Sequence, residues 1–211
     1  MARRIRHHVN PLKVDYLAIG AERIALPAQG PVEVELGCAD ACWLFERAAA
    51  QPDLTLVGLE IRAPLVEEVN RRAAASGLGG RLRAVYANIS LDLENLFAGG
   101  SVDRFVVNFP DPWFKRRQHK RRLVTDALAH VLWRQLRSGG EVFFQSDVWA
   151  LALEAMAVLE AADAQFENVR GPWSFLNANP FGAHSKREQQ CVARARPIWR
   201  LLYRKRALRP Q

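Results

Sequence analysis

The sequence predicts a single α/β domain with a mostly parallel, seven-stranded sheet and helices on both faces of the sheet. Three observations support this fold class. Short apolar, β-branched runs alternate with helical patterns five times along the chain, which is typical of repeated βα units. The chain contains 211 residues, the length of one ordinary domain. Hydrophobic residues make up 49% of it, enough for one sizeable core, so a second full domain is not expected.

The chain is predicted to divide into a basic N-terminal arm, residues 1–30, and the domain itself, residues 31–211. The arm is polar, carries Arg3, Arg4 and Arg6, and is interrupted by prolines and glycines. This composition favours an irregular segment over a long helix or strand.

The first two βα units are expected directly after the arm. Val32–Leu36 is a β-branched, apolar run that ends at Gly37, which indicates a strand followed by a tight turn. Residues 42–50 then have a helical pattern that ends before a proline. The second unit comprises a strand at residues 55–59 and a helix at residues 63–75, with glycines just past the helix end.

The following segments continue the alternation and complete the sheet. The expected elements are a strand at 82–86, a helix at 91–97, a strand at 104–109, a helix at 123–136 that Gly139 and Gly140 end, a strand at 141–145 and a helix at 148–162. After these the pattern changes. We expect a further strand at 166–169, a loop that covers a site at 171–184, and an apolar edge strand at 198–203.

The charge balance indicates a polyanionic partner. The formal net charge is +8 and the sequence pI is near 10.0, so the folded surface should carry a positive field. Nucleic acid is therefore the first partner to consider, although a basic composition alone also occurs in proteins that bind none.

The cysteines and the apolar segments indicate a protein of the cytoplasm. Cys38, Cys42 and Cys191 are an odd number without paired spacing, which argues against a disulfide framework and for a reducing compartment. No further ligands accompany Cys38 and Cys42, so no metal site is expected and both are interpreted as buried small residues. Charged residues interrupt every candidate membrane span, and the N-terminus lacks the apolar run of a signal peptide, so no membrane contact is expected.

The turn after the first strand is the candidate cofactor site. In open α/β sheets ligands bind at the carboxyl ends of the strands, and here that turn contains Glu35, Gly37 and further small residues. Glu60 ends the second strand about 20 residues later, where an acid commonly holds the ribose hydroxyls of a nucleoside. The turn lacks the full glycine series of a dinucleotide-binding loop and the lysine of a P-loop, which favours S-adenosylmethionine over NAD. On the purely structural interpretation, Glu35 and Glu60 are solvated acids at strand ends.

The most specific segment is residues 108–122, which directly follow the fourth strand. It reads Asn-Phe-Pro-Asp-Pro-Trp-Phe and then has six Lys or Arg within residues 115–122. The two prolines fix the backbone on both sides of Asp111 and hold its carboxylate in one direction. Trp113 offers a face on which a base can stack, and the cations can neutralise several phosphates. So dense a cluster of like charges is unfavourable at a helix start, which favours a functional interpretation.

The run FPDPWFKRRQHKRR resembles a segment of bacterial tRNA (guanine-N7)-methyltransferases, and the similarity extends over most of the chain. The resemblance implies a Rossmann-like class I methyltransferase domain that uses S-adenosylmethionine to methylate guanine N7 in tRNA, at the guanosine of the variable loop. It implies a catalytic or substrate-positioning role for Asp111. The residues implied to bind the cofactor are Glu35, Gly37, Glu60 and Asn88, and those implied to bind the tRNA substrate are Lys115, Asp147, Ser185 and Glu188.

Two departures from the family pattern concern these implied sites. The first loop of the family usually reads Glu-x-Gly-x-Gly-x-Gly, whereas Ala39 and Ala41 replace its last two glycines. An alanine forced into left-handed backbone space costs about 1–2 kcal/mol, so weaker cofactor binding is expected. In the segment Ser-Lys-Arg-Glu, Arg187 stands where the family typically has an aromatic or aliphatic residue, which puts the substrate contact of this segment in question.

Three alternatives stay open from the sequence. One is a methyltransferase-like RNA-binding module that has lost cofactor binding through Ala39 and Ala41. Another is a methyltransferase for small molecules, which leaves the basic run without a purpose. A nicotinamide oxidoreductase agrees least with the incomplete glycine series. Both a monomer and a homodimer are compatible with the sequence.

Overall fold

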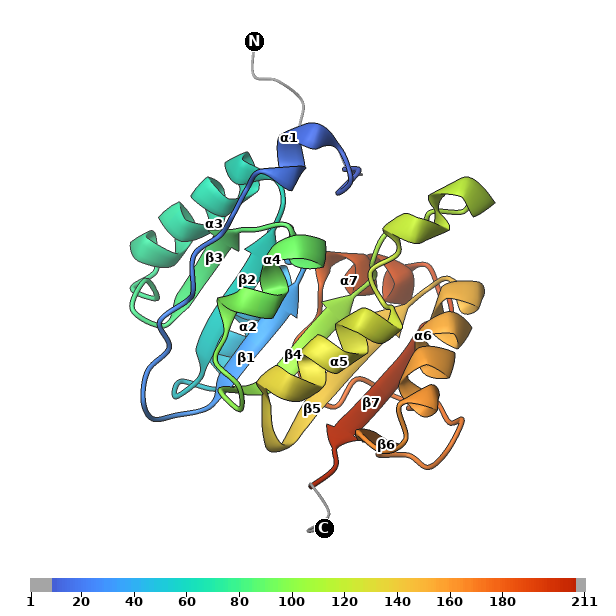
Figure 1. Ribbon diagram of the computed structural model, residues 1–211. Helices are drawn as coiled ribbons and strands as arrows, with labels where there is room; N and C mark the ends of the chain where they lie inside the picture. Colours follow the sequence, from blue (N-terminus) through green and yellow to red (C-terminus); the bar gives the residue numbers. More distant parts are fainter. Residues whose placement is uncertain (1–8, 208–211) are drawn as a thin grey trace.

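A seven-stranded sheet runs through the centre of the computed structural model, which describes residues 9–207 (Figure 1). The strands are β1 (Val32–Leu36), β2 (Thr55–Glu60), β3 (Leu82–Tyr86), β4 (Val102–Asn108), β5 (Leu136–Ser146), β6 (Phe166–Asn168) and β7 (Trp199–Lys205). Their order across the sheet is β3-β2-β1-β4-β5-β7-β6. The two pairings that β7 makes, with β5 and with β6, are antiparallel and the other four pairings are parallel, so the predicted mostly parallel, seven-stranded sheet is confirmed.

Helices cover both faces of the sheet, as predicted (Figure 1). They are α1 (Val14–Leu17), α2 (Cys42–Ala50), α3 (Ala63–Ala75), α4 (Ile89–Leu96), α5 (Asp126–Gln135), α6 (Trp149–Ala161) and α7 (Lys186–Ala193), with a 3-10 helix, η1, at Arg116–Arg121. Buried side chains of α4, α5 and α6 form one core cluster with the sheet, and those of α2 and α3 form a second cluster on the opposite face. Because both faces are covered, the central strands β1 and β2 are buried almost throughout, including the glutamates of β1.

The helix expected at residues 123–136 is shorter than predicted, and the expected role of its glycines is wrong. Thr125 caps the helix, because its hydroxyl accepts a hydrogen bond from the Leu128 amide, and α5 therefore starts at Asp126. At the other end Leu136 is already extended and pairs with Val102 of β4. Gly139 and Gly140 consequently lie inside β5, beside a shift in register between β4 and β5.

Two expectations for the C-terminal third are also wrong. Residues 198–203 were expected as an edge strand, but β7 pairs with both β5 and β6, so β6 forms that edge. The loop at residues 171–184 was expected to cover a site, but Leu176, Phe181 and Ala183 pack in the second core cluster instead, and Phe175 packs against the first. Helix α7, which follows this loop, was not expected.

The described part of the arm packs against the domain. The side chain of Ile24 is buried in the first core cluster, and its amide donates to the Leu96 carbonyl over 2.8 Å. Arg3, Arg4 and Arg6 lie outside the described residues. Within residues 9–207, no helix is long and apolar enough to cross a membrane. No group of three or more His, Cys, Asp or Glu in the same range is placed to hold a metal ion.

Candidate cofactor and substrate site

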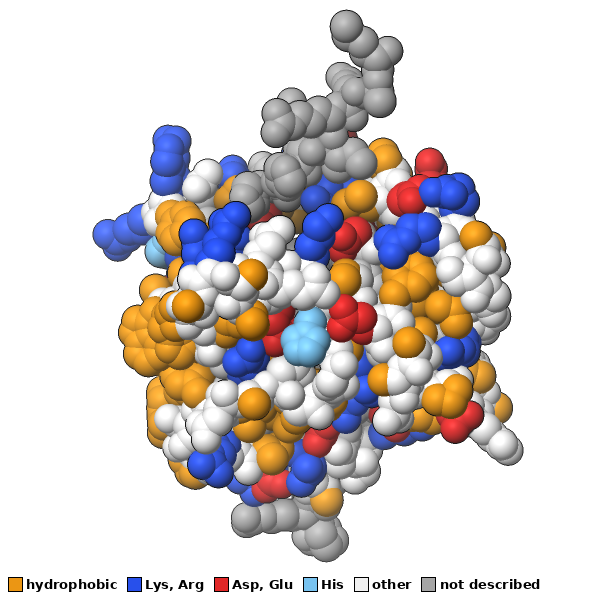
Figure 2. Space-filling model, turned by 180° about the vertical axis from the view of Figure 1, so that it is seen from behind, with side chains coloured by type: hydrophobic (Ala, Val, Ile, Leu, Met, Phe, Trp, Pro, Cys, Tyr) orange, Lys and Arg blue, Asp and Glu red, His pale blue; other side chains and the backbone are white. Residues whose placement is uncertain are grey.

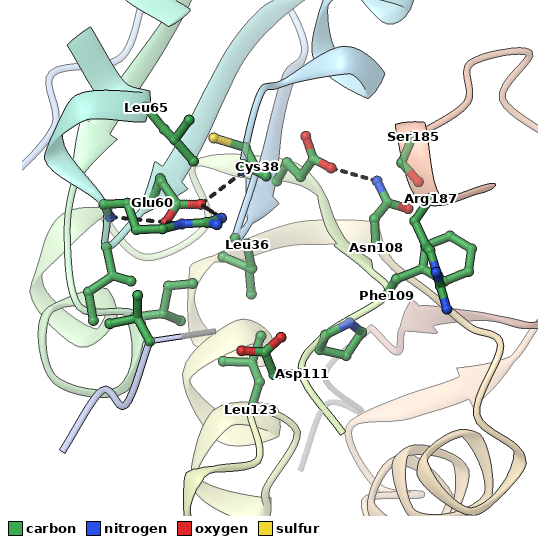
Figure 3. A pocket seen from close by; sticks show the side chains of 18 of the residues that line it. Leu36, Cys38, Glu60, Leu65, Asn108, Phe109, Asp111, Leu123, Ser185 and Arg187 are labelled. Atoms are coloured by element: carbon green, nitrogen blue, oxygen red, sulfur yellow. Dashed lines mark hydrogen bonds and ion pairs between the residues drawn. The ribbon is translucent and has the colours of Figure 1, made fainter. Parts of the chain in front are cut away.

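A cavity of about 820 Å³ opens where the strand order reverses, between the carboxyl ends of β1 and β4. Seven of the predicted site residues line it, namely Glu35, Gly37, Glu60, Asn88, Asp111, Asp147 and Ser185. They come from six segments far apart in the sequence. The fold brings these segments to one cavity, because parallel strands end at the same edge of the sheet. Figure 3 shows Glu60, Asp111 and Ser185 around this space.

The remaining two predicted residues lie elsewhere. Lys115 is exposed and does not line the cavity. Glu188 is 0% exposed, and its carboxylate binds other side chains behind the cavity wall. Asp147 lines the cavity but is paired with Arg187 over 2.6 Å.

The first loop crosses closely over the end of β2. The amides of Gly37 and Cys38 donate to the Leu59 carbonyl, and the Ala39 amide donates to Oε2 of Glu60 over 3.0 Å. The fit is tight because a Cβ atom on Gly58 would lie 2.5 Å from the sulfur of Cys38. The strand below the loop therefore needs a glycine at this contact.

The conformation of this loop places both alanine substitutions in left-handed space. The φ angles are 50° at Ala39 and 55° at Ala41, so the strain expected from the sequence is present in the folded loop. Gly37 has a φ of 81°, which a glycine adopts without penalty. The loop lines the cavity although Ala39 and Ala41 each carry a methyl group where the family usually has a glycine.

Replacing Ala39 with glycine is expected to raise the free energy of unfolding by up to about 1 kcal/mol. Relief of about 1–2 kcal/mol of left-handed strain outweighs the greater unfolded-chain entropy of glycine. Urea unfolding measures the change. Ala74, which lies exposed in α3, is the matched control, because glycine there should lower stability by about 1 kcal/mol. A loss of stability in both variants would contradict the strained loop.

Glu35 is the acid with the most unusual surroundings. It is 2% exposed, and Asn108 of β4 donates to its Oε1 over 2.7 Å. The buried Oε2 has no hydrogen-bond partner. Burial raises the pKa of Glu35 to about 8, against the smaller lowering effect of Asn108. A cationic donor such as an ammonium group would satisfy the orphaned oxygen, so the site fits the amino end of an amino-acid cofactor.

Glu60 holds the opposite side of the cavity together with Arg62. The guanidinium of Arg62 binds both carboxylate oxygens over 2.8 Å, and the Arg62 amide binds Oε1. These bonds, together with the nearby Asp111 carboxylate, raise the pKa of Arg62. The carboxylate of Glu60 stands at the end of β2, where two neighbouring ribose hydroxyls of a nucleoside would fit its two oxygens.

Asn88 joins the arm to the cavity. It caps α4 by accepting from the Ser90 amide, and its side-chain amide donates to the carbonyls of Pro11 and Tyr16. Pro11 also lines the cavity. Asn88 therefore connects the cavity wall beside β3 with the part of the arm that contains Pro11 and Tyr16.

Asp111 sits on a bent segment between β4 and η1. Phe109 and Trp113 have φ angles of 49° and 45°, and they flank the Pro-Asp-Pro unit on either side. The indole of Trp113 lies under the guanidinium of Arg121 at 5.1 Å. The segment thus turns twice within a few residues and presents Asp111 to the cavity (Figure 3).

Sequence reasoning did not single out Arg62, which lines the cavity, and it assigned Arg121 only to the phosphate-binding run and not to the cavity. It also missed the contact between Asn108 and Glu35. A signal for Asn108 existed, because it ends a strand parallel to the one that carries Glu35. Arg62 follows Glu60 by two positions, but nothing in the sequence shows that its side chain turns back to the cavity.

Comparison with known proteins agrees with this geometry. Residues 29–201 match the model of a family described as "Putative methyltransferase". The chain is 38% identical to a tRNA (guanine-N(7)-)-methyltransferase of Synechococcus sp. (strain JA-3-3Ab), over 95% of this chain and 85% of that protein. The chain belongs to the tRNA (guanine-N(7)-)-methyltransferase family. Its similarity to the family member of Synechococcus elongatus is 36% identity over 96% of this chain and 97% of that protein.

The fold of this family member also matches solved methyltransferases. The crystal structure of the 16S rRNA methyltransferase KamB has a TM-score of 0.61 at 15% identity, covering 84% of this chain and 88% of that chain. At this identity the likeness concerns the fold alone, and it confirms the predicted Rossmann-like methyltransferase domain.

Proposed function

We propose that this chain transfers a methyl group from S-adenosylmethionine to guanine N7 of tRNA, at the guanosine of the variable loop. The observation that carries the proposal is one cavity that has Glu35 and Glu60 on the cofactor side and Asp111 beside Trp113 on the other. The family to which the chain belongs supports the substrate and the reaction. We place the activity in the cytoplasm, where tRNA and a reducing environment occur together.

The residues that line the cavity fit both the amino-acid end and the nucleoside end of the cofactor. Glu35 would hold its amino group, Glu60 its ribose hydroxyls, and Gly37 together with Asn88 would shape the walls around it. When bound, S-adenosylmethionine would supply an electrophilic methyl group, to which the in-plane lone pair of N7 would bond as the carbon–sulfur bond breaks. Arg62 must release at least part of Glu60 for the ribose to bind there.

Guanine N7 carries no proton, so the chain needs no general base before attack. Its contribution is to hold N7 in line with the methyl group, which can supply several kcal/mol. Asp111 would accept hydrogen bonds from the N1 and amino groups of the base, which orients the base. Its negative charge also favours the positive charge that develops on the ring.

The basic segment provides the surface for tRNA phosphates. Lys115, Arg116, Arg117 and Lys120 are exposed on and beside η1, next to the cavity mouth. Lys and Arg side chains also gather along the upper edge of the rear face in Figure 2. Asp147, Ser185 and Arg187 form the part of the rim opposite Glu60 and are proposed to contact the substrate near the target base.

Affinity for tRNA is expected to fall steeply with salt, because bound cations release counterions from the RNA. The slope of log affinity against log salt is negative, and changing Arg116, Arg117 and Lys120 together to glutamine should reduce its magnitude by about 2. Filter binding at several salt concentrations measures the slope. Arg71→Gln, which removes an exposed cation paired with Glu68 on α3, is the control and should change it little. A slope equal to that of the parent protein in the triple variant would place the tRNA elsewhere.

The function itself is tested by incubating the protein with labelled S-adenosylmethionine and unmodified tRNA, followed by mass analysis of the nucleosides. We expect label in 7-methylguanosine, at the variable loop when the tRNA is mapped. Binding of tRNA without cofactor binding would instead favour an RNA-binding module. Label in other nucleosides only, or none in tRNA, would refute the proposed reaction.

A further inference from the structure

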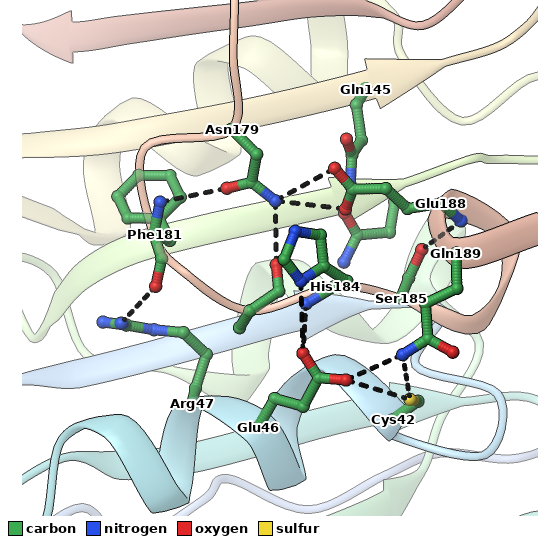
Figure 4. Close-up of polar contacts among 12 residues, drawn as sticks. Cys42, Glu46, Arg47, Gln145, Asn179, Phe181, His184, Ser185, Glu188 and Gln189 are labelled. Carbon is green, nitrogen blue, oxygen red and sulfur yellow. Dashed lines mark hydrogen bonds and ion pairs between the residues drawn. The ribbon is translucent and has the colours of Figure 1, made fainter. Parts of the chain in front are cut away.

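A buried chain of hydrogen bonds leads from α7 to the cofactor acid. Arg200 of β7 donates to Oε1 of Glu188 over 2.8 Å and to Oε1 of Gln145 over 3.1 Å. The amide nitrogen of Gln145 donates to Glu188 and to Asn108, each over 2.8 Å. Asn108 then donates to Glu35 over 2.7 Å. Figure 4 shows Gln145 and Glu188 at the α7 end of this chain, and Figure 3 shows Asn108 at the cavity end.

The charged groups at the two ends of this chain of hydrogen bonds determine which way each amide points. An ionised carboxylate only accepts hydrogen bonds and a guanidinium only donates them. Gln145 must therefore turn its oxygen to Arg200 and its nitrogen to Glu188. The second hydrogen on that nitrogen faces Asn108, which must accept it with its oxygen. Only the nitrogen of Asn108 is left for Glu35, because a flipped amide would set two donors against each other.

Glu188 is placed to orient the amide of Gln145, and it is not placed for contact with solvent or RNA. Glu188 and Gln145 are both 0% exposed, and Asn179 donates to both carboxylate oxygens of Glu188. Ser185 caps α7, and in a capping box an acid three positions later returns to the cap residue. Here the Glu188 carboxylate points to Gln145 and Arg200 instead. Burying the Glu188 carboxylate against Arg200, whose side chain is 11% exposed, is costly unless further hydrogen bonds satisfy the carboxylate, and here Gln145 and Asn179 supply them.

We propose that Glu188, Gln145 and Asn108 are positioning residues that keep an amide donor aimed at Glu35, so that Glu35 meets the cofactor's amino group in its ionised form. The inference rests on the proposed binding of the cofactor at Glu35. It removes Glu188 from the residues that contact tRNA. Glu35 also faces Asp40, Glu60 and Cys38, and the substitutions used below leave these three groups unchanged.

The test compares two buried glutamines. Gln145→Met interrupts the chain of hydrogen bonds between Glu188 and Asn108 and keeps the side-chain volume. Gln135→Met is the matched control, because Gln135 is 2% exposed and donates only to the Leu93 and Glu94 carbonyls, which have no link to Glu35. Calorimetry gives the affinity for S-adenosylmethionine from about pH 6 to about pH 9 in both variants and in the parent protein. Steady-state assays give KM for the cofactor and kcat.

In Gln145→Met, the pH at which cofactor affinity reaches half of its plateau is expected to rise by about one unit. This corresponds to an affinity about tenfold lower at pH 7, with the gap narrowing toward high pH. KM for the cofactor should rise more than kcat falls. Gln135→Met should lose comparable thermal stability without a shift of the pH profile. A profile in Gln145→Met that coincides with that of Gln135→Met would overturn the inference.

Glu188→Gln provides the second variant, and it decides the question if Gln145→Met does not fold. It retains an acceptor for Gln145 and Arg200 but loses the charge, so a smaller shift in the same direction is expected. A raised KM for tRNA with an unchanged cofactor profile would instead assign Glu188 to substrate contact and overturn the inference. Failure of the parent protein to bind S-adenosylmethionine would refute the proposed function itself, which distinguishes the two failures.

Discussion

Replacing Asp111 with alanine is expected to lower kcat for tRNA methylation by about 100-fold or more, with little change in cofactor affinity. The carboxylate is the group proposed to hold the target base in line and to favour the charge that develops on it, and removing such a preorganised group commonly costs 10²–10³ in rate. Glu35 and Glu60, which are proposed to bind the cofactor, are both retained in this variant. Single-turnover assays with saturating enzyme measure the chemical step directly.

The control for this variant is Asp163→Ala. Asp163 is an exposed aspartate between α6 and β6 that lies outside the cavity. Its removal should leave kcat unchanged. Asp111→Asn adds a second comparison, since the amide keeps the shape but loses the charge, and it should recover only a small part of the rate. Methylation at the parental rate in Asp111→Ala would remove Asp111 from the mechanism.

Replacing Glu35 with glutamine is expected to weaken S-adenosylmethionine binding by about 30- to 150-fold, the value of one charge-assisted hydrogen bond of about 2–3 kcal/mol. The effect depends on pH. Burial raises the pKa of Glu35 to about 8, so without cofactor the carboxyl is largely protonated at pH 7. An ammonium group binds the ionised form, so binding should release a proton at pH 7, and the contribution of Glu35 to affinity should rise as the pH increases through about 8.

Calorimetry in buffers of different ionisation enthalpy measures the proton release. Comparison of the parent protein with Glu35→Gln in the same buffers cancels the titration of the ligand's own amino group. Glu67→Gln, which alters an exposed acid on α3, is the control and should retain both the affinity and the released proton. Equal proton release in the parent protein and in Glu35→Gln would show that Glu35 is not the group that ionises.

The parallel strands and the cavity edge could be predicted because their signals are local. The run Val32–Leu36 was predicted with the boundaries that the structure shows, and both acids that end β1 and β2 line the cavity. The same reasoning misplaced the start of β5, because glycine is a common helix terminator and nothing local shows that Leu136 pairs with Val102. Tertiary pairing decided the conformation there.

Helix α7 was missed although a signal for it existed. Ser185 and Glu188 have the spacing of a capping box, but the helix has only eight residues and most of them are polar, so its apolar face is too short to stand out in the sequence. The placement of Glu188 could not be predicted at all. Its partners Gln145, Asn179 and Arg200 are distributed over three segments, and only the folded chain brings them to one carboxylate.

The most direct test of the account is a crystal structure of the protein with S-adenosylhomocysteine. We predict that the ligand occupies the cavity at the carboxyl ends of β1 and β2, with its amino group on Oε2 of Glu35 and its ribose hydroxyls on Glu60. Its sulfur should face the side of the cavity that carries Asp111. A ligand bound elsewhere, or bound here with its sulfur turned away from Asp111, would contradict the account.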